Sequence, residues 1–374
     1  MQTQNTTSKP RYEILDGLRG VAALLVIIYH AYECFPVETW PIGHGYLAVD
    51  FFFILSGFVI GYAYDDRWKL SAKAGARLTF WQFCKRRLIR LHPMVVFGVL
   101  LGLVCFLIAG GVAWDGTKAT VSGLMWAVLL GLFLIPCVPG FKGDVRGNGE
   151  MFSLNGPHWS LFFEYIGNIM YALFIRRFST RVLAVWTALL GALFAWFFLA
   201  DVVGYGSIGV GWTLADNNFW GGLLRMTFSY SLGLLISRVF TPMKVKGAFW
   251  LSSALIALFL FVPNFGEWNC LYEVVCVICL FPVILWIGAS GVTTDRRSTA
   301  ICGFLGDISY PLYAVHYPSM YIFYAYIGFP ETFRMPSECY LYMIALVVGN
   351  ILLAYLVLRL YDLPVRKYLA ARWR

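Results

Sequence analysis

Charged residues are scarce in this chain of 374 residues. Lys, Arg, Asp and Glu together make up 13% of the sequence, whereas hydrophobic residues make up 60% and aromatic residues 18%. The mean hydropathy of +0.70 lies far above what a soluble domain needs to build one core. The composition therefore excludes a soluble globular enzyme and predicts an integral membrane protein.

Long polar segments and internal repeats are also missing. Apolar stretches long enough to span a bilayer follow one another with only short loops between them, so we expect a single membrane domain over residues 1–374. No fixed-period repeat is visible, which disfavours an inverted-repeat transporter. The nine cysteines are odd in number and scattered through apolar runs, a pattern typical of small buried residues and not of a disulfide framework.

The motifs of soluble catalytic sites are absent as well. The sequence contains no HExxH, Walker A or GxSxG pattern, and we predict no metal site. A net charge of +9 is also found in nucleic-acid-binding proteins, but in a basic membrane protein the excess of Lys and Arg belongs to loops on the cytoplasmic side. We therefore expect a lipid bilayer, and no nucleic acid, as a partner.

Eleven apolar segments near the spanning length define the predicted helices. They cover residues 14–35, 46–64, 92–113, 121–137, 158–175, 182–200, 218–237, 248–263, 269–289, 302–327 and 340–360. Positive charge sets their orientation, because loops rich in Lys and Arg stay in the cytoplasm. Lys9 and Arg11 place the N-terminus inside. The basic loop after the second segment must also lie inside; it carries Arg67, Lys69, Lys73, Arg77, Lys85, Arg86, Arg87 and Arg90.

One segment cannot cross if the later basic stretches are also to lie inside. Leaving out residues 121–137 places the RRFSTR stretch at 176–181 and the basic C-terminal tail in the cytoplasm. We therefore predict an all-α polytopic protein of the plasma (inner) membrane, with about ten transmembrane helices around a central cavity and both termini cytoplasmic. Residues 121–137 are expected to form a re-entrant or surface-lying element that packs in protein or lines a cavity.

Two polar residues lie inside the first apolar segment, LRGVAALLVIIYH. Arg19 and His30 are eleven positions apart, which on a helix is about 16 Å of rise and places both on broadly one face. Ionisable residues in spans are costly and usually face a cavity. The alternatives are that Arg19 extends to the inner headgroups and that His30 is a hydrogen-bonded packing residue.

Other polar residues fall at a similar depth on separate helices. Under the predicted topology, five ionisable side chains lie in the outer half of the membrane: Asp50, His158, Glu164, Arg225 and His316. A structural ion pair between Asp50 and Arg225 is an alternative to a catalytic role for Asp50. The stretch KRRLIRLHP could hold phosphates, but taken alone it is better explained by the orientation rule. For His44 and His92 we favour structural or incidental roles.

Five stretches occur in one order along the chain. They are LDGLRGVAALLVIIYH with Arg19 and His30, GYLAVDFFFILSGFVI with Asp50, then RRLIRLHP, HWSLFFEY and GDISYPLYAVHYP. Together they resemble the membrane-bound acyltransferase 3 family, the bacterial group that O-acylates cell-surface glycans. The chain departs from that pattern at His158 and at Phe163, which leaves the local acid chemistry open. It ends soon after the last span, so we expect no appended SGNH-type domain.

The resemblance implies an enzyme that transfers an acyl group, in the simplest case acetyl, from cytosolic acyl-CoA to a hydroxyl of an extracytoplasmic glycan or lipid-linked saccharide. It implies His30 as the base, acting directly or carrying the acyl group transiently. The implied supporting catalytic residues are Glu164, His316 and Asp50. Phosphates of the acyl-CoA donor would be held by Arg19, Arg86, Arg87 and Arg90. Substrate contacts are expected from His158, Trp159, Ser160, Arg225 and Tyr310.

Two other functions remain open at this stage. A transporter or lipid flippase would use the same polar cavity without covalent chemistry, and a structural or sensory membrane protein would show neither transport nor turnover. The acceptor, the acyl group and the presence of a homo-oligomer are not fixed by the sequence.

Overall fold

A computed structural model describes residues 11–36, 40–69, 78–293, 295–328 and 335–373. Within these ranges the regular elements are helices and there is no strand, which confirms the predicted all-α class. The α-helices are α1 (Glu13–Tyr32), α2 (Ala48–Lys69), α3 (Phe80–Ile108), α4 (Val121–Leu132), α5 (His158–Leu173), α6 (Thr180–Leu199), α7 (Asn218–Val239), α8 (Ala248–Leu260), α9 (Asn269–Val275), α10 (Phe281–Ser290), α11 (Arg296–Phe323), α12 (Pro336–Val357) and α13 (Leu363–Arg372). Short 3-10 or π-helical turns are η2 (Gly45–Leu47), η4 (Ile175–Arg177), η5 (Gly266–Trp268), η6 (Cys276–Leu280), η7 (Tyr324–Gly328) and η8 (Leu358–Asp362).

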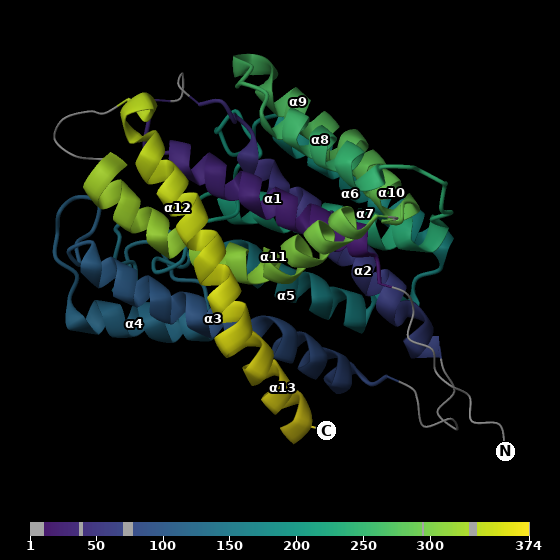
Figure 1. The fold of residues 1–374 in the computed structure, drawn as a ribbon, viewed down its shortest axis with the longest axis horizontal. Helices are drawn as coiled ribbons and strands as arrows, with labels where there is room; N and C mark the ends of the chain where they lie inside the picture. The colour runs from purple at the N-terminus through teal and green to yellow at the C-terminus, as the bar shows by residue number, and fades with distance from the viewer. Residues whose placement is uncertain (1–10, 37–39, 70–77, 294, 329–334, 374) are drawn as a thin grey trace.

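Two closely packed helix pairs form the centre of the bundle. Helix α1 lies along α11, and α2 lies along α7 (Figure 1). The second pair meets at glycines: a Cβ atom added at Gly57 would lie 2.0 Å from the carbonyl oxygen of Tyr230, and one added at Gly233 would lie 2.0 Å from that of Ile54. Such small residues let two backbones approach closely, as in other membrane helix pairs.

Replacing Gly233 by Ala is expected to destabilise the fold. The new methyl group would overlap a backbone carbonyl, which cannot rotate away, so α2 and α7 must separate. Overpacking of this kind typically costs about 1–3 kcal/mol. Thermal unfolding of the detergent-solubilised protein measures the effect. Gly349→Ala on α12 is the matched control, because a Cβ atom there meets nothing within 4 Å; equal melting temperatures for the two variants would contradict the prediction.

The surface of the helices is suited to lipid. Six stretches among the described residues are long and apolar enough to cross a membrane: Glu13–Tyr32, Gly45–Lys69, Phe80–Ile108, Thr180–Leu199, Gly266–Ser290 and Pro336–Arg372. Large apolar side chains are exposed on α6 and α12, for example Leu189 and Leu341. Exposed apolar surface on this scale marks a membrane-facing protein. The number of ten crossings stays a prediction, since α5 and α8 have only 16 and 13 residues.

The segment predicted not to cross forms the short helix α4. Its twelve residues rise about 18 Å, less than the roughly 30 Å of a bilayer core. It packs against α3 on one side, where Gly131 contacts Val99, while Val121 and Met125 are exposed. Because α8 is about as short, the statement that residues 121–137 do not cross stays a prediction.

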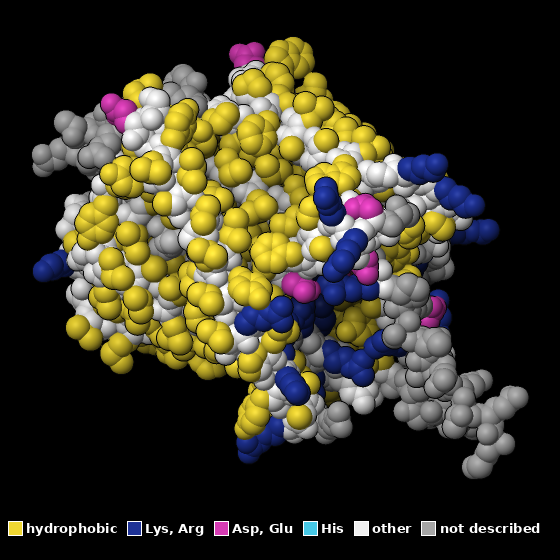
Figure 2. Space-filling view, viewed as in Figure 1, with side chains coloured by type: hydrophobic (Ala, Val, Ile, Leu, Met, Phe, Trp, Pro, Cys, Tyr) yellow, Lys and Arg dark blue, Asp and Glu magenta, His cyan; other side chains and the backbone are white. Residues whose placement is uncertain are grey.

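The third helix begins earlier than the sequence predicts. Its expected start was residue 92, whereas α3 begins at Phe80 after a capping box between Thr79 and Gln82. The capping box satisfies free backbone groups, and Lys and Arg are good helix formers, so the basic stretch is helical and not a loop. Lys and Arg side chains gather at the end of the molecule where α13 lies, while apolar side chains cover most of the same face (Figure 2). Lys9, Lys73 and Arg77 lie outside the described residues.

Candidate active site

Two cavities lie in the bundle. The first, which we call the arginine cavity, has a volume of about 540 Å³, and the second, the histidine cavity, about 500 Å³. The charged side chains of the arginine cavity are Arg11, Asp16, Arg19, Arg87, Arg90, Glu164, Asp307, Arg359 and Arg366. The histidine cavity is lined by His30, Glu33, Tyr46, Glu150, Trp159, Ser207, Trp212, Arg225 and Tyr317, among others. Val49 and Tyr313 line both cavities, so the two spaces adjoin.

His30 is held by a carboxylate at the end of its own helix. Its Nδ1 atom lies 2.6 Å from Oε2 of Glu33, three residues later. Since a carboxylate accepts, Nδ1 carries the proton of the neutral ring and Nε2 keeps its lone pair. The Tyr324 hydroxyl donates to the same Glu33 oxygen at 3.0 Å. With 16% of its side chain exposed, His30 is reachable from the cavity and oriented as a base.

Two aromatic rings fix the plane of the His30 imidazole. His316 stacks on it with ring centroids 5.4 Å apart, and Tyr317 meets it edge-on at 4.7 Å. Nδ1 of the buried His316 donates to the carbonyl oxygen of Tyr313 at 2.8 Å. His316 therefore acts on His30 by packing, while its own ring is held by the backbone of α11.

The arginine cavity has an excess of positive charge. Six arginines and three acidic residues line it. Asp16 pairs with Arg11 and with Arg19, the latter at 3.0 Å, and Glu164 pairs with Arg87 at 2.9 Å. The Arg19 Nε atom also donates to the Ser309 hydroxyl at 2.8 Å. Asp362, which does not line the cavity, pairs with Arg366 at 2.8 Å. Even with this fourth acid the six guanidinium groups are not all neutralised, so the cavity is suited to an anionic ligand.

Two hydroxyl groups lie where the two cavities adjoin. Tyr313 and Ser160 are hydrogen-bonded through their hydroxyls at 2.6 Å, and the Ser160 hydroxyl also reaches the carbonyl oxygen of Pro157 at 3.0 Å. Tyr313 belongs to both cavities and Ser160 to the arginine cavity. A ligand that passes from one cavity to the other must pass these two hydroxyls.

Asp50 and Arg225 form a fully buried ion pair between α2 and α7. Arg225 Nη2 lies 2.6 Å from Asp50 Oδ2, and Nε lies 3.2 Å from both carboxylate oxygens. The guanidinium also donates to the carbonyl oxygens of Val210 and Tyr46, at 2.7 and 3.0 Å. The structural pairing considered as an alternative for Asp50 is therefore present, and it ties the helix pair to two loops.

The predicted site residues divide into three groups. His30, Trp159 and Arg225 line the histidine cavity. The arginine cavity is lined by Arg19, Arg87, Arg90, Ser160, Glu164 and Tyr310. Lining neither cavity are Asp50, Arg86, His158 and His316. His316 still contacts His30 by stacking, so the structure brings the two predicted histidines together.

Three placements differ from the sequence-based expectation. Arg86 is exposed outside the arginine cavity, because successive residues of α3 lie about 100° apart and Arg87 faces inward. Glu164 is paired with Arg87 and Ser56 in the arginine cavity, so it does not lie beside His30. His158 is completely buried, with no hydrogen-bond partner for its ring nitrogens among the described residues.

The segment 121–137 was expected to pack in protein or to line a cavity. None of its residues lines either of the two cavities. The reason is that α4 packs on the far side of α3, away from the central helix pairs. Among the described residues, no group of three His, Cys, Asp or Glu side chains is placed to hold a metal ion.

Sequence reasoning missed several charged residues that line the two cavities, among them Glu33, Arg359 and Arg366. Glu33 follows His30 by one helical turn, and the local sequence HAYE carried this signal. Arg359 and Arg366 belong to η8 and α13 and enter the arginine cavity from the C-terminal end. Arg366 was considered only as part of the basic C-terminal tail and Arg359 only as part of the last apolar segment, and no local pattern indicates that this end of the chain packs against α3.

Comparison with known proteins decides the family. The profile of a family described as an acyltransferase domain matches residues 12–359. The chain belongs to the acyltransferase 3 family. It is therefore a membrane-bound acyltransferase, and the family indicated by the five motifs is confirmed.

Relatives in this family include two bacterial proteins. Protein 2 in the picA locus of Rhizobium radiobacter is 34% identical over 168 residues, which are 43% of this chain and 81% of the relative. The O-acetyltransferase OatA of Staphylococcus aureus (strain NCTC 8325 / PS 47) is 25% identical over 385 residues. That match covers 96% of this chain but only 58% of OatA, so the chain spans little more than half of that relative. No solved structure matches the chain.

Proposed function

We propose that this acyltransferase moves an acetyl group from acetyl-CoA to a hydroxyl of a glycan or lipid-linked saccharide. The observation that supports this reaction is the junction of two unlike cavities, one rich in arginine and one holding the His30–Glu33 pair. An activated anionic donor and a hydroxyl acceptor need such different surroundings, and they must meet at one point. OatA, which carries the name of an O-acetyltransferase, favours acetyl as the transferred group.

The donor would occupy the arginine cavity. Arginines bind phosphate oxygens through charge-assisted hydrogen bonds, so Arg19, Arg87 and Arg90 would hold the nucleotide end of acetyl-CoA, assisted by Arg359 and Arg366. The narrow pantetheine arm would then extend past Tyr313 and bring the thioester to His30. This placement requires the arginine cavity to face the cytosol, with both termini on that side and the histidine cavity facing outward.

The acceptor would react beside His30. Nε2 of His30 removes the proton of the acceptor hydroxyl as its oxygen attacks the thioester carbonyl carbon. The bond between that carbon and sulfur then breaks, and the thiolate of CoA leaves and takes up the proton that His30 carries. Glu33 stabilises the imidazolium formed in between and keeps Nδ1 protonated.

Labelled acetyl-CoA tests the function directly. Purified protein in detergent is incubated with [¹⁴C]acetyl-CoA and a bacterial surface-glycan extract, and transfer to the glycan is measured together with free CoA. We expect both to appear in equal amounts. Transport or flipping of the saccharide in vesicles without thioester consumption would instead identify the transporter or flippase, and the absence of both activities would leave a structural or sensory role.

Arg90→Ala is expected to weaken acetyl-CoA binding while Arg86→Ala is not. The two arginines are four residues apart on α3 and carry the same charge, but only Arg90 lines the cavity. Loss of one hydrogen bond to a charged group costs about 1.5–3 kcal/mol, which is roughly a tenfold to hundredfold increase in Kd. Calorimetric titration with acetyl-CoA measures it. Equal affinities for the two variants would place the donor elsewhere.

A further inference from the structure

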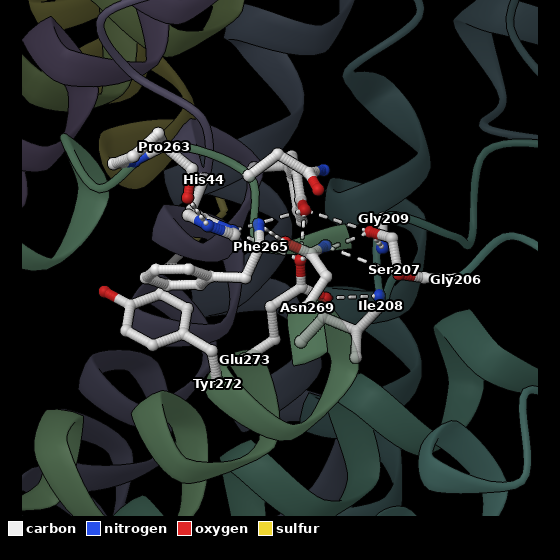
Figure 3. Close-up of polar contacts among 12 residues, drawn as sticks. His44, Gly206, Ser207, Ile208, Gly209, Pro263, Phe265, Asn269, Tyr272 and Glu273 are labelled. Atoms are coloured by element: carbon white, nitrogen blue, oxygen red, sulfur yellow. Dashed lines mark hydrogen bonds and ion pairs between the residues drawn. The ribbon is translucent and has the colours of Figure 1, made fainter. Parts of the chain in front are cut away.

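A second buried carboxylate lies behind the wall of the histidine cavity. Glu273 on α9 is fully buried, yet its two oxygens accept several hydrogen bonds (Figure 3). The donors are the Ile208 backbone N–H at 2.6 Å, the Asn269 side chain at 2.5 Å and the Tyr46 hydroxyl, and His44 Nδ1 lies 3.2 Å from the same carboxylate. These donors hold the buried carboxylate in one orientation.

The Glu273 cluster reaches the cavity through two hydroxyl groups. The Ser207 hydroxyl donates to the Tyr46 hydroxyl at 3.0 Å, and both side chains line the histidine cavity. His44 secures the other side, since its Nε2 atom donates to the carbonyl oxygen of Pro263 at 3.2 Å. His44 is thus a structural residue that holds the carboxylate, as expected from its position in a loop, while Tyr46 and Ser207 present the cluster to a ligand.

The carboxylate sets the direction of this hydrogen-bond chain. Glu273 can only accept, so the Tyr46 proton points toward it, and the Ser207 proton must then point toward the Tyr46 oxygen. The Ser207 oxygen also accepts the Gly209 backbone N–H at 3.0 Å. Neither hydroxyl has a proton left for a ligand. Both oxygens offer only lone pairs to the cavity.

The charged side chains that line the histidine cavity also disfavour an anionic ligand. Two further carboxylates, Glu33 and Glu150, line the histidine cavity, and its one lining arginine, Arg225, is paired with Asp50. This count refers to the described residues that line the cavity. A carboxylate or phosphate brought beside Ser207 would find no proton donor there and would be repelled by nearby negative charge.

We propose that Ser207 and Tyr46 form a recognition subsite that binds a hydroxyl or amide N–H of the acceptor as hydrogen-bond donor and rejects anionic groups, with Glu273 as the positioning residue. The proposal rests on the function proposed above, in that the histidine cavity receives the acceptor. It names the acceptor more closely: a neutral sugar unit, and not a uronic acid or a sugar phosphate, lies beside His30. The indoles of Trp159 and Trp212 in the same cavity are suited to pack on the apolar face of such a ring.

A matched pair of ligands tests the subsite. Methyl β-glucopyranoside and methyl β-glucopyranosiduronate differ only in a hydroxymethyl group against a carboxylate, and their binding is followed by tryptophan fluorescence of the purified protein. We expect the neutral glycoside to bind at least tenfold more tightly. Ser207→Ala should weaken its binding about threefold to tenfold, while Ser229→Ala, a buried serine of α7 that lines neither cavity, should not.

Glu273→Gln tests the direction of the hydrogen bonds from Ser207 through Tyr46 to residue 273. The amide can donate its N–H to the Tyr46 oxygen, which frees a hydroxyl proton for the ligand. The ratio of the Kd of the glucuronide to the Kd of the neutral glycoside should therefore fall toward one. If this variant fails to fold, the ligand pair and Ser207→Ala still decide. Equal or tighter binding of the glucuronide, no effect of Ser207→Ala, or no binding of the neutral glycoside overturns the proposal.

Acetyl-CoA binding and turnover report separately on the proposed function, which fails if wild-type protein shows neither.

Discussion

Replacing His30 by Ala is expected to lower acetyl transfer by about 10²–10⁴-fold, the contribution of a positioned general base. The imidazole borders an open cavity, and its removal leaves the packing of α1 against α11 largely in place. Initial rates with labelled acetyl-CoA measure the effect, and thermal unfolding together with acetyl-CoA affinity shows that fold and donor site survive. Transfer close to the wild-type rate would remove His30 from the reaction.

Glu33→Gln separates orientation from chemistry. A glutamine at this position can donate to Nδ1, so the ring would keep its proton on Nε2 and face the acceptor with the wrong atom. We expect kcat to fall roughly a hundredfold, since the equivalent carboxylate of a Ser-His-Asp triad contributes up to about 10⁴-fold. The KM for acetyl-CoA should not change, because Glu33 lies in the other cavity. A change in that KM with kcat preserved would contradict the orienting role.

Asp50→Ala is expected to cause the largest loss of stability. The substitution leaves the Arg225 guanidinium buried without its counter-charge, and breaking a buried pair in this way costs about 3–5 kcal/mol. Unfolding of the solubilised protein, or the fraction recovered folded, measures it. Asp307→Ala is the control, since its pair with Arg11 is largely exposed and such pairs contribute about 0–1 kcal/mol.

A double substitution identifies the cause of that loss. Asp50→Leu combined with Arg225→Met removes both charges and keeps apolar volume, and such exchanges are often neutral or stabilising. We expect it to recover most of the stability lost in Asp50→Ala. If the double variant is as unstable as the single one, the bonds from Arg225 to the carbonyl oxygens of Val210 and Tyr46 hold the loops, and the unpaired charge is not the cause.

Local features of the site were predictable from the sequence. Helix α3 shows where such prediction stops. The spacing of Arg19 and His30 predicted that both side chains face the interior from broadly one face of a helix, because helical geometry is the same in every sequence. In the structure they line two adjoining cavities instead of one. The run of basic residues before the third span marked Arg86, Arg87 and Arg90 together. Arg87 and Arg90 line the arginine cavity and Arg86 lies outside it, since which face of α3 turns inward depends on its contacts with α5, α11 and α13.

Partners across the chain were not predictable. Glu164 lies in a stretch resembling a catalytic motif, yet it pairs with Arg87, 77 residues earlier. The carboxylate beside His30 is Glu33, and the buried carboxylate behind the cavity wall is Glu273, which sits in an unremarked apolar helix. The contacts of Glu164 and Glu273 depend on how separate helices are packed, whereas Glu33 lies one helical turn after His30.

The sequence by itself determined the class of the protein: its hydropathy requires a membrane, its apolar segments require helices, and its ordered motifs give the acyltransferase 3 family. These properties follow from composition and short-range spacing, which do not depend on the fold. Only the tertiary structure decided that two cavities adjoin at Tyr313, that C-terminal arginines enter one of them, and that Asp50 is bound to Arg225. These contacts join residues that lie up to several hundred positions apart. Many residues of the same chemical type could form them, and which ones do is fixed only when the helices pack.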